Sequence, residues 1–294
     1  MNRVIGFLST AAFFTAALLV ALAGTAAAQT APTLDHFYCY FAQGEIRPKR
    51  FMLQDQFDVG LNPLIPPEVE TVQLLKIVRF CNPVQKTTAD GKVTGIQHPA
   101  DHLAMYLFTP DPWSSHPIIP RVVIIRNQFG TQRIRTANAV LLAVPSGKVW
   151  PVPVTNLPPP PNIPTDIDHF KCYLASGRAI DRRVLLKDQF FQDTREGVLA
   201  AVLQPILFCN PVKKTIPPIS PTAPPSITSI TNPDGHLACY VTTRRNFQST
   251  LFYDNQFSPQ LAGLLVSRPD FLCVPSLKLK WAVVPAPSSL VPPD

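Results

Sequence analysis

Four histidines recur at nearly constant spacing, and each closely follows an aspartate. The histidines are His36, His102, His169 and His236, at intervals of 66, 67 and 67 residues, and the aspartates are Asp35, Asp101, Asp168 and Asp234. An aspartate can orient a histidine that acts as the general base for a nucleophilic serine. A catalytic base is needed once, however, whereas this pair occurs four times. The pattern therefore predicts an architectural histidine that starts a strand and hydrogen-bonds a neighbouring loop.

Other catalytic groupings are not evident in the sequence. It contains no Gly-x-Ser-x-Gly elbow, no His-Glu-x-x-His motif and no glycine-rich phosphate loop. The four glutamates do not recur with a partner; they are Glu45, Glu68, Glu70 and Glu196. A carboxylate pair for glycoside hydrolysis can be assembled from distant positions, so an enzyme remains an alternative. We predict no catalytic residue, no metal ligand and no cofactor.

The histidine opens the first of three sequence blocks that recur in the same order four times. The first block occupies 36–40, 102–106, 169–173 and 236–240 and ends in a tyrosine. The second block is Asp55-Gln56-Phe57, Asn127-Gln128-Phe129, Asp188-Gln189-Phe190 and Asn255-Gln256-Phe257. The third block occupies 80–86, 142–148, 208–214 and 272–278 and ends in a lysine. Such repetition indicates one module in four copies.

The copies alternate in their third block, which predicts a duplicated pair. The first and third copies read Cys-Asn-Pro-Val, and the second and fourth read Val-Pro-Ser. One module is near the lower limit for an independent core, whereas two reach the usual size of a domain. We therefore predict a first β domain at 33–150, with modules 34–86 and 102–148, and a second at 166–284, with modules 167–214 and 234–280. A proline-rich linker at 151–165 would separate them, and a proline-rich tail would occupy 285–294.

The elements that carry these blocks are expected to be β-strands. The 34 prolines argue against long helices, because an interior proline removes a backbone donor and clashes with the preceding turn. Alternate residues of the opening block, such as Phe37, Cys39 and Phe41, should share one face of a strand. Apolar runs at 51–53, 122–125, 184–186 and 251–253 are typical of strands buried on both faces. The predicted fold is all-β, with each domain a sandwich or barrel made from two related modules.

Residues 1–28 have the pattern of a secretory signal peptide. A basic start is followed by an apolar stretch over 4–22 and by the small residues Ala26-Ala27-Ala28. The alternative is an uncleaved membrane anchor. No later segment has 18 uninterrupted apolar residues, so no membrane span is expected in the mature chain. We predict a secreted or extracytoplasmic protein, in the periplasm or at the cell surface.

Six cysteines in an exported chain indicate disulfides, and the repeat restricts their pairing. Three copies hold both a strand cysteine and a closing cysteine, whereas the second copy has Met105 and Ala143 at these positions. Pairing within copies leaves no thiol without a partner. The predicted structural disulfides are Cys39–Cys81, Cys172–Cys209 and Cys239–Cys273. Met105 is expected to pack on Ala143 and to fill the volume of the missing bridge.

The chain is basic, with a formal net charge of +7. The second, third and fourth copies carry arginine groups: Arg121, Arg126, Arg133 and Arg135, then Arg178, Arg182 and Arg183, then Arg244 and Arg245. The loop at 111–116 adds Trp113, which we expect to be exposed. Evenly spread positive charge favours weak attraction to an acidic extracellular polymer or cell-surface component, and ordinary solubilising charge is the alternative. Export and the lack of a base-stacking motif argue against nucleic acid.

The combined blocks resemble a tandem domain family of exported bacterial proteins known only as a domain of unknown function. The likeness rests on His-Phe-x-Cys-Tyr, Asp-Gln-Phe, Phe-Cys-Asn-Pro-Val-x-Lys, His-Leu-x-Cys-Tyr, Asn-Gln-Phe and Leu-Cys-Val-Pro-Ser-x-Lys, and covers nearly the whole mature chain. It implies an extracytoplasmic bacterial setting and supplies no activity. The first predicted domain departs from the pattern at Met105 and Ala143.

Repeated architecture without a unique reactive cluster favours a function other than catalysis. We predict an exported binding, adhesion or surface-associated structural module. The alternative is an enzyme that acts on an extracellular polymer, with a site between paired modules. A concave pocket lined by residues that only one domain has would favour the enzyme. A simple spacer at the cell exterior is a third hypothesis.

Overall fold

The computed structural model describes residues 33–58, 69–111, 119–150, 159–191, 197–218, 220 and 222–284. The predicted signal peptide at 1–28, the tail at 285–294 and the linker residues 151–158 lie outside this description. The described residues all belong to one compact unit, which spans Ala31–Asp294.

Every regular element among the described residues is a β-strand, so the all-β prediction is confirmed. The first copy contains β1 (Phe37–Gly44), β2 (Arg50–Asp55) and β3 (Glu70–Thr88), and the second contains β5 (His102–Pro110), β6 (Arg121–Asn127) and β7 (Gly130–Val149). The third contains β8 (Phe170–Gly177), β9 (Arg182–Asp188) and β10 (Val198–Ile216), and the fourth contains β12 (His236–Thr242), β13 (Gln248–Asn255) and β14 (Ser258–Val283). The short strands β4 (Val93–Thr94) and β11 (Ser226–Thr228) pair with β3 and β10.

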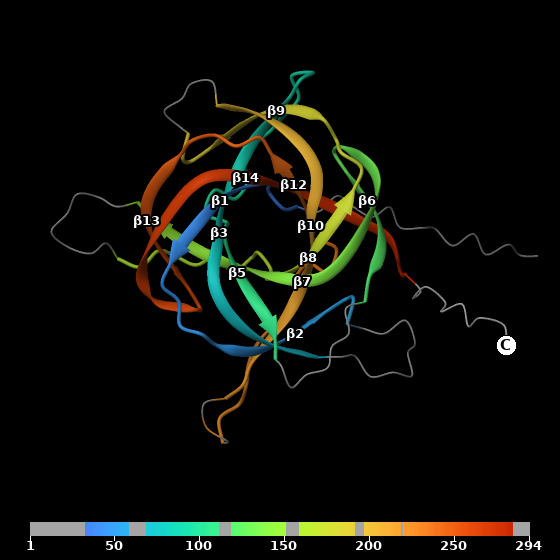
Figure 1. Ribbon diagram of the computed structural model, residues 1–294. Helices are drawn as coiled ribbons and strands as arrows, with labels where there is room; N and C mark the ends of the chain where they lie inside the picture. Colours follow the sequence, from blue (N-terminus) through green and yellow to red (C-terminus); the bar gives the residue numbers. More distant parts are fainter. Residues whose placement is uncertain are drawn as a thin grey trace, which may run out of the picture. The chain divides into compact units, whose positions relative to one another are not determined.

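Eight strands form a closed antiparallel ring (Figure 1). The opening strand of each copy pairs with the closing strand of its own copy and with that of the preceding copy. The order around the ring is therefore β1, β3, β5, β7, β8, β10, β12 and β14. Because β1 also pairs with β14, the fourth copy joins the first. Of the two predicted forms, this closure is that of a barrel, and it pairs both edges of each of these strands.

The middle strand of each copy interlocks copies that are two apart. β2 pairs with β3 and with β10 of the third copy, and β9 pairs with β10 and with β3 of the first. In the same way, β6 pairs with β7 and with β14 of the fourth copy, and β13 pairs with β14 and with β7 of the second. The predicted tandem domains at 33–150 and 166–284 are therefore not confirmed, because strands from the two ranges pair with each other in one sheet. Each module satisfies its strand edges with several neighbours, so a pair of modules does not close by itself.

The ring encloses an apolar cluster built around sulfur, which we name the sulfur core. Disulfides join Cys39 to Cys81, Cys172 to Cys209, and Cys239 to Cys273, each between residues directly opposite in adjacent strands. At the fourth equivalent position, Met105 lies directly opposite Ala143. All eight residues are fully buried in this one cluster. The disulfides follow the pairing expected from the repeat and are typical of extracellular or periplasmic proteins.

The other face of the ring strands packs outward into a second apolar cluster. Alternation along β1 places Cys39 inward and Tyr38 and Tyr40 outward. The middle strands bury one face fully against this layer, whereas their second face is half-buried in β2, β6 and β13 and exposed at Leu185 of β9, so full burial on both faces is not observed. In β9, for example, Leu186 is buried whereas Leu185 is exposed. A middle strand lies outside the ring, and its second face is only partly covered.

Candidate functional site

The second block of each copy forms a turn that binds the copy two positions along the ring. Asp188 Oδ1 accepts a hydrogen bond from the backbone N–H of Phe190 at 3.0 Å, which closes the turn. Asp188 Oδ2 accepts from the Tyr40 hydroxyl at 2.8 Å and from Asn82 Nδ2 at 3.1 Å. Equivalent bonds join Asp55 to Tyr173 and Asn210, Asn127 to Tyr240 and Ser276, and Asn255 to Tyr106 and Ser146. The turn block therefore has a structural role in every copy.

The glutamine of each turn contacts the histidine of the preceding copy. Gln189 Oε1 lies 3.0 Å from His102 Nε2 and also accepts from Lys148 Nζ. The other sets are Gln56 with His236 and Lys278, Gln128 with His36 and Lys86, and Gln256 with His169, which Lys214 also contacts. Each histidine thus hydrogen-bonds a loop from a neighbouring copy.

Burial keeps these histidines neutral. Burial, followed by the charge of the neighbouring lysine, lowers the pKa to about 4 for His36 and to about 3 for His102, His169 and His236. Burial also lowers the lysine pKa, to about 7 for Lys148 and Lys214 and to about 8 for Lys86 and Lys278. A histidine with so low a pKa is a poor general base near neutral pH.

Two of the four aspartates that precede the histidines, Asp35 and Asp168, bind loop backbone. Asp35 accepts from the backbone N–H groups of Gln97 and His98, and Asp168 accepts from those of Thr231 and Asn232, at 2.6–3.1 Å. Among the described residues, no hydrogen bond joins either carboxylate to the histidine that follows it. The orienting acid of a catalytic pair is therefore missing at these positions.

One ion cluster joins a lysine present only in the third copy to carboxylates of the first copy. Lys171 occupies a position that holds tyrosine or alanine in the other copies, and its side chain is buried. Its Nζ lies 2.6 Å from Glu70 Oε2 and 3.1 Å from Asp58 Oδ2. Burial and the neighbouring Asp55 carboxylate raise the pKa of Asp58 to about 6, while Lys171 opposes this shift. Because both carboxylates compensate a buried ammonium group, we assign the cluster to structure.

The junction where the ring closes, between β1 and β14, differs from the other three. Two residues before the closing cysteine position, three copies have an apolar residue (Leu141, Leu207, Phe271) and the first has Arg79. Three residues before it, three copies again have an apolar residue (Val78, Val140, Ile206) and the fourth has Asp270. Arg79 and Asp270 form a bidentate ion pair, with Nε–Oδ1 and Nη2–Oδ2 distances of 3.0 and 2.8 Å. A charged pair thus replaces apolar contacts at this junction.

Two bulges in β14 bring charged residues to the same place. Opposite β1, Phe271 pairs with Cys39, Pro269 with Tyr40, and Ser267 with Phe41. Asp270 and Arg268 are therefore extra residues without a partner in β1. Bulges re-aim side chains and are frequent near binding and active sites.

Phe41 lies at the mouth of the ring among several guanidinium groups. It is two residues beyond Cys39 on the same face of β1, and it is half-buried. The guanidinium of Arg79 lies 3.7 Å from its ring centroid, and those of Arg268 and Arg244 lie at 5.3 and 5.8 Å. Cation–π attraction therefore helps to hold three basic groups together around one ring.

A row of aromatic rings continues from these arginines. The backbone N–H of Arg268 donates to the Phe247 carbonyl at 2.9 Å, and Phe247 stacks on Phe190 at 5.0 Å. Phe190 contacts Trp150 edge to face at 5.0 Å, and Trp150 is 40% exposed. Arg245 lies over Phe191, which packs on Phe247. We name this surface the aromatic–arginine patch; it comprises Phe41, Trp150, Phe190, Arg244, Arg245, Phe247 and Arg268.

The patch offers positive charge to solvent. Arg244, Arg245 and Arg268 are exposed, and within the described part of the chain none of them forms an ion pair. Asp270 is nearby but is buried and bound by Arg79. Three guanidinium groups are therefore available to an anion.

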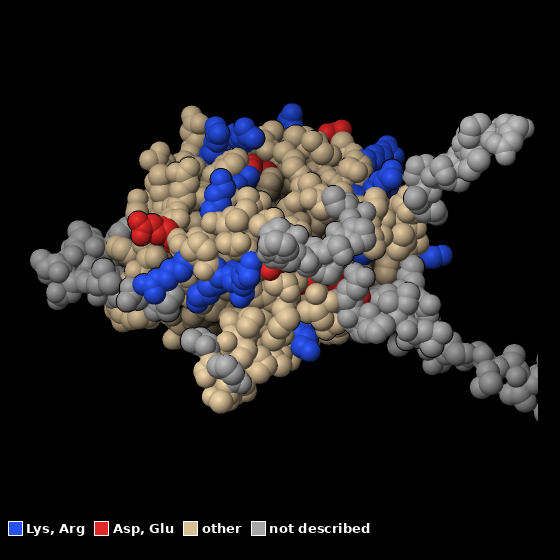
Figure 2. All heavy atoms as spheres, turned by 60° about the horizontal axis from the view of Figure 1, so that its bottom comes forward, with Lys and Arg blue, Asp and Glu red and all other residues tan. Residues whose placement is uncertain are grey.

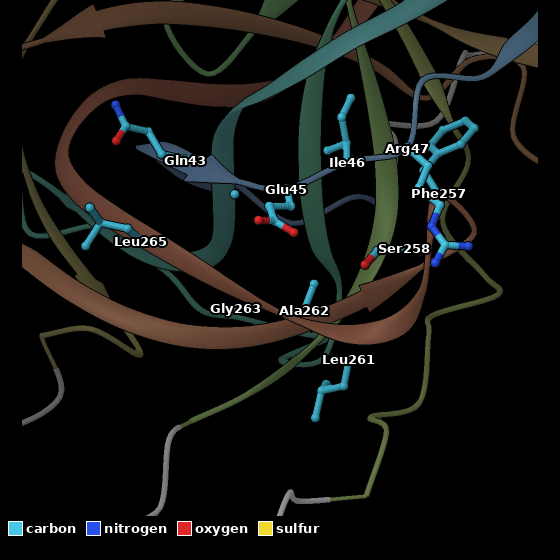
Figure 3. Close-up of a pocket in the computed structure, with 11 residues that line it drawn as sticks. Gln43, Glu45, Ile46, Arg47, Phe257, Ser258, Leu261, Ala262, Gly263 and Leu265 are labelled. Atoms are coloured by element: carbon cyan, nitrogen blue, oxygen red, sulfur yellow. The ribbon is translucent and has the colours of Figure 1, made fainter.

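A cavity of about 740 Å³ adjoins the same junction and is shown in Figure 3. Its walls are the segment that follows β1 and the start of β14. In Figure 3 the Glu45 side chain extends from the segment after β1 toward the facing strand, which carries Ser258 and Ala262. We name this cavity the Glu45 pocket; it is lined by Gln43, Gly44, Glu45, Ile46, Arg47, Phe257, Ser258, Leu261, Ala262, Gly263 and Leu265.

The arginines that the sequence singled out have several roles. Arg121 is buried, donates to the carbonyls of Ile119 and Phe57, and is structural rather than part of a basic surface. Arg133 and Arg135 are exposed on one face of β7, as expected, and basic groups are scattered over the face in Figure 2. Trp113 lies outside the described residues. Arg244 and Arg245 belong to the patch.

Sequence reasoning missed several members of this site. Phe41, Arg79, Arg268 and Asp270 were not singled out as functional candidates. The sequence does contain evidence for two of them, because Arg79 and Asp270 occupy positions that are apolar in the other three copies. A comparison of the copies position by position finds them.

The described residues contain neither a group of three or more His, Cys, Asp or Glu side chains placed to hold a metal ion nor a helix long and apolar enough to cross a membrane. The best-defined features for ligand contact are therefore the patch and the pocket. No family model, curated protein or solved structure matches this chain.

Proposed function

We propose that this protein is an exported, non-enzymatic module that binds an anionic extracellular polymer on the aromatic–arginine patch. The observation that carries the proposal is the cluster of Arg244, Arg245 and Arg268, which are exposed and form no close ion pair among the described residues, although the buried Asp270 carboxylate lies near Arg244 and Arg268. The guanidinium group is planar and can bind a carboxylate or sulfate through two parallel hydrogen bonds. Aromatic rings beside it provide apolar surface at low entropic cost.

The shape of the patch supports a polymer rather than a small ion. Phe41 contacts Arg268, whose backbone bonds Phe247, and Phe247 contacts Trp150 through Phe190. All of these residues are exposed or half-buried, so several groups in series can contact one chain. Several modest contacts along one chain add up to firm binding through high effective concentration. The ring beneath the patch is fixed by the disulfides of the sulfur core, which limits the entropy lost on binding.

The alternative, an enzyme that cleaves the polymer, receives less support. Glycoside hydrolysis commonly uses two carboxylates that face each other across the scissile bond. Among the described lining residues of the Glu45 pocket, Glu45 is the only carboxylate. We therefore propose binding without turnover. The disulfides support the export on which the proposal depends.

The test compares polymer binding by wild-type protein and by two triple variants that lose the same charge. Binding to alginate, hyaluronan and uncharged dextran is measured by affinity electrophoresis and calorimetry. We expect the variant Arg244→Ala/Arg245→Ala/Arg268→Ala to lose at least tenfold in affinity for the acidic polymers. The matched variant Arg126→Ala/Arg133→Ala/Arg135→Ala should stay within about twofold of wild type, and binding should weaken as salt is raised.

Equal loss in the two triple variants would mean that net charge, rather than the patch, attracts the polymer. Equal binding of dextran and alginate by wild type would also contradict the proposal. Release of reducing ends from any polymer by the pure protein would favour the enzyme.

A further inference from the structure

We infer that the aromatic–arginine patch and the Glu45 pocket are two parts of one site for an acidic heteropolysaccharide. Acidic sugar residues would lie on the patch, and an uncharged sugar residue would occupy the pocket. The inference rests on the proposed function and adds to it the class of polymer and the basis of its selection.

The two parts are continuous along β1 and β14. Phe41 of the patch pairs with Ser267, and Gln43 of the pocket pairs with Leu265 in the same unbroken register. Residues two apart in a strand share a face and lie roughly 7 Å apart. These four side chains are exposed or half-buried, whereas the intervening Ala42 and Val266 are buried. The patch therefore leads to the pocket over about one sugar unit.

The pocket differs from the patch in charge. It contains one carboxylate, Glu45, and one guanidinium, Arg47, together with the amide of Gln43 and the hydroxyl of Ser258. The opposite charges cancel, and the polar groups suit the hydroxyls of a sugar. A second carboxylate close to Glu45 would be repelled and would lose hydration on burial. The pocket is thus suited to a neutral sugar and discriminates against a uronate.

The walls of the pocket are held in place before any ligand binds. The Tyr253 hydroxyl donates to the Glu45 carbonyl at 3.3 Å, and Lys49 Nζ donates to the Gln256 carbonyl at 3.2 Å. The segment after β1 is thereby tied both to β13 and to the turn before β14. Phe257 is buried beneath the pocket against Phe51 and Tyr106. A cavity of about 740 Å³ with such fixed walls falls in the size range of sites for small ligands.

The experiment uses two sets of oligosaccharides of equal length and measures affinity by calorimetry. Hyaluronan octasaccharide alternates a uronate with a neutral amino sugar, and oligogalacturonate carries a uronate at every position. We expect wild-type protein to bind the alternating octasaccharide at least tenfold more tightly.

Three variants separate the pocket from the patch. Glu45→Gln removes the repelling charge with little change in shape, so binding of oligogalacturonate should improve at least threefold and the preference should shrink. Gly263→Phe places a ring in the pocket, because a Cβ at Gly263 meets no atom within 4 Å. This variant should lower the affinity for the alternating octasaccharide to that for oligogalacturonate. Gly95→Phe, at another exposed glycine with open space around its Cβ and no positive φ, controls for the added ring.

The outcomes distinguish the two claims. If the arginine triple variant binds both oligosaccharides as wild type does, the proposed function fails. If that triple variant loses both ligands while wild type binds them equally and Glu45→Gln changes neither, the patch binds anions but the pocket takes no part, and the inference is wrong. Unaltered thermal unfolding of each variant shows that the fold is intact.

Discussion

At the scale of residues, the turn blocks explain an alternation in the sequence. Asp55 and Asp188 receive hydrogen bonds from asparagine amides, whereas Asn127 and Asn255 donate to serine hydroxyls. A carboxylate only accepts and an amide nitrogen only donates, so each combination satisfies both partners. Copies that close with Asn-Pro-Val are therefore matched by aspartate turns, and copies that close with Val-Pro-Ser are matched by asparagine turns.

This matching predicts that replacing a turn aspartate by asparagine costs less stability if its partners in the closing strand are replaced at the same time. Asp188→Asn would place an amide donor against the Asn82 donor in a buried site, and we expect a loss of about 1–3 kcal/mol in the free energy of unfolding. Adding Asn82→Val and Val84→Ser recreates the combination of the other copies and should recover part of the loss. Urea unfolding of the single, double and triple variants measures this coupling. Additive losses in the triple variant would contradict the match.

The second copy offers a site for a fourth disulfide. Met105 and Ala143 are buried and directly opposite, in the same relation as the three native pairs. Met105→Cys/Ala143→Cys should form a bond that closes a loop similar to the native loops of 34–42 residues. We expect up to about 3–4 kcal/mol of added stability, less any strain. Non-reducing peptide mapping checks the bond, and two free thiols in the folded double variant would contradict the prediction.

At the scale of elements, each long closing strand pairs both with ring strands and with middle strands. The inner part of each strand forms the ring, and the outer, N-terminal part pairs with the middle strand of its own copy. Breaks in register separate the two parts in all four closing strands, as at Leu74 to Lys76 of β3 and at Pro269 to Ser267 of β14. A bulge increases the local twist, which allows one strand to serve two neighbours.

The turn between β9 and β10 depends on a glycine. Gly197 has a φ of +69°, and a Cβ there would lie 2.7 Å from the Leu186 carbonyl oxygen. Gly197→Ala should therefore cost more than Gly91→Ala, because Gly91 has a φ of +80° but open space around it. We expect a loss of about 1 kcal/mol at Gly91 and at least twice that at Gly197, measured by urea unfolding. Equal losses would mean that the backbone angle alone matters.

The elements were easier to predict than their arrangement. Proline content and period-two patterning predicted strands, and the loss of two cysteines in the second copy predicted the disulfides. Those signals are local or arise from comparison of the copies. The pairing of β2 with β10, or of β6 with β14, leaves no such trace, because any apolar middle strand fits any closing strand. The two-domain prediction did not include these pairings between the two ranges.

The candidate site was predicted less completely than the fold. Arg244 and Arg245 were recognised as charges, but their partner Phe41 was interpreted only as a core residue. Its position at the mouth of the ring follows from closure between β1 and β14, two strands more than 200 residues apart. Long-range closure of this kind has no signature within either strand.

At the scale of the whole molecule, four buried or half-buried lysines (Lys86, Lys148, Lys214 and Lys278) couple stability to pH. Their pKa is about 7 to 8 in the folded protein, and that of an unfolded lysine is about 10.4. Between these values the unfolded chain binds more protons, so the free energy of unfolding should rise as pH increases from about 7.5 to 9.5. Lys171, whose pKa is raised by Asp55, Asp58 and Glu70 against the effect of burial, loses its contribution only at higher pH.

Urea midpoints at pH 7.5, 8.5 and 9.5 measure this effect. Lys148→Met removes one of the titrating groups and should flatten the rise, whereas the exposed Lys92→Met should leave it unchanged. A midpoint that falls over this range in the wild-type protein would mean that the buried lysines keep their ordinary pKa.

Closure of the ring also predicts that the two halves of the chain depend on each other. A fragment of residues 33–150 keeps the Cys39–Cys81 disulfide but lacks β14 beside β1, β10 beside β2, and β9 beside β3. It would expose unpaired strand edges and half of the sulfur core, so we expect no cooperative thermal unfolding from it alone. The fragment 166–284 should behave in the same way, and a mixture of oxidised halves should recover the near-ultraviolet circular dichroism of the intact chain. Cooperative unfolding of either isolated half would instead support two tandem domains, because only a closed core of its own could give that transition.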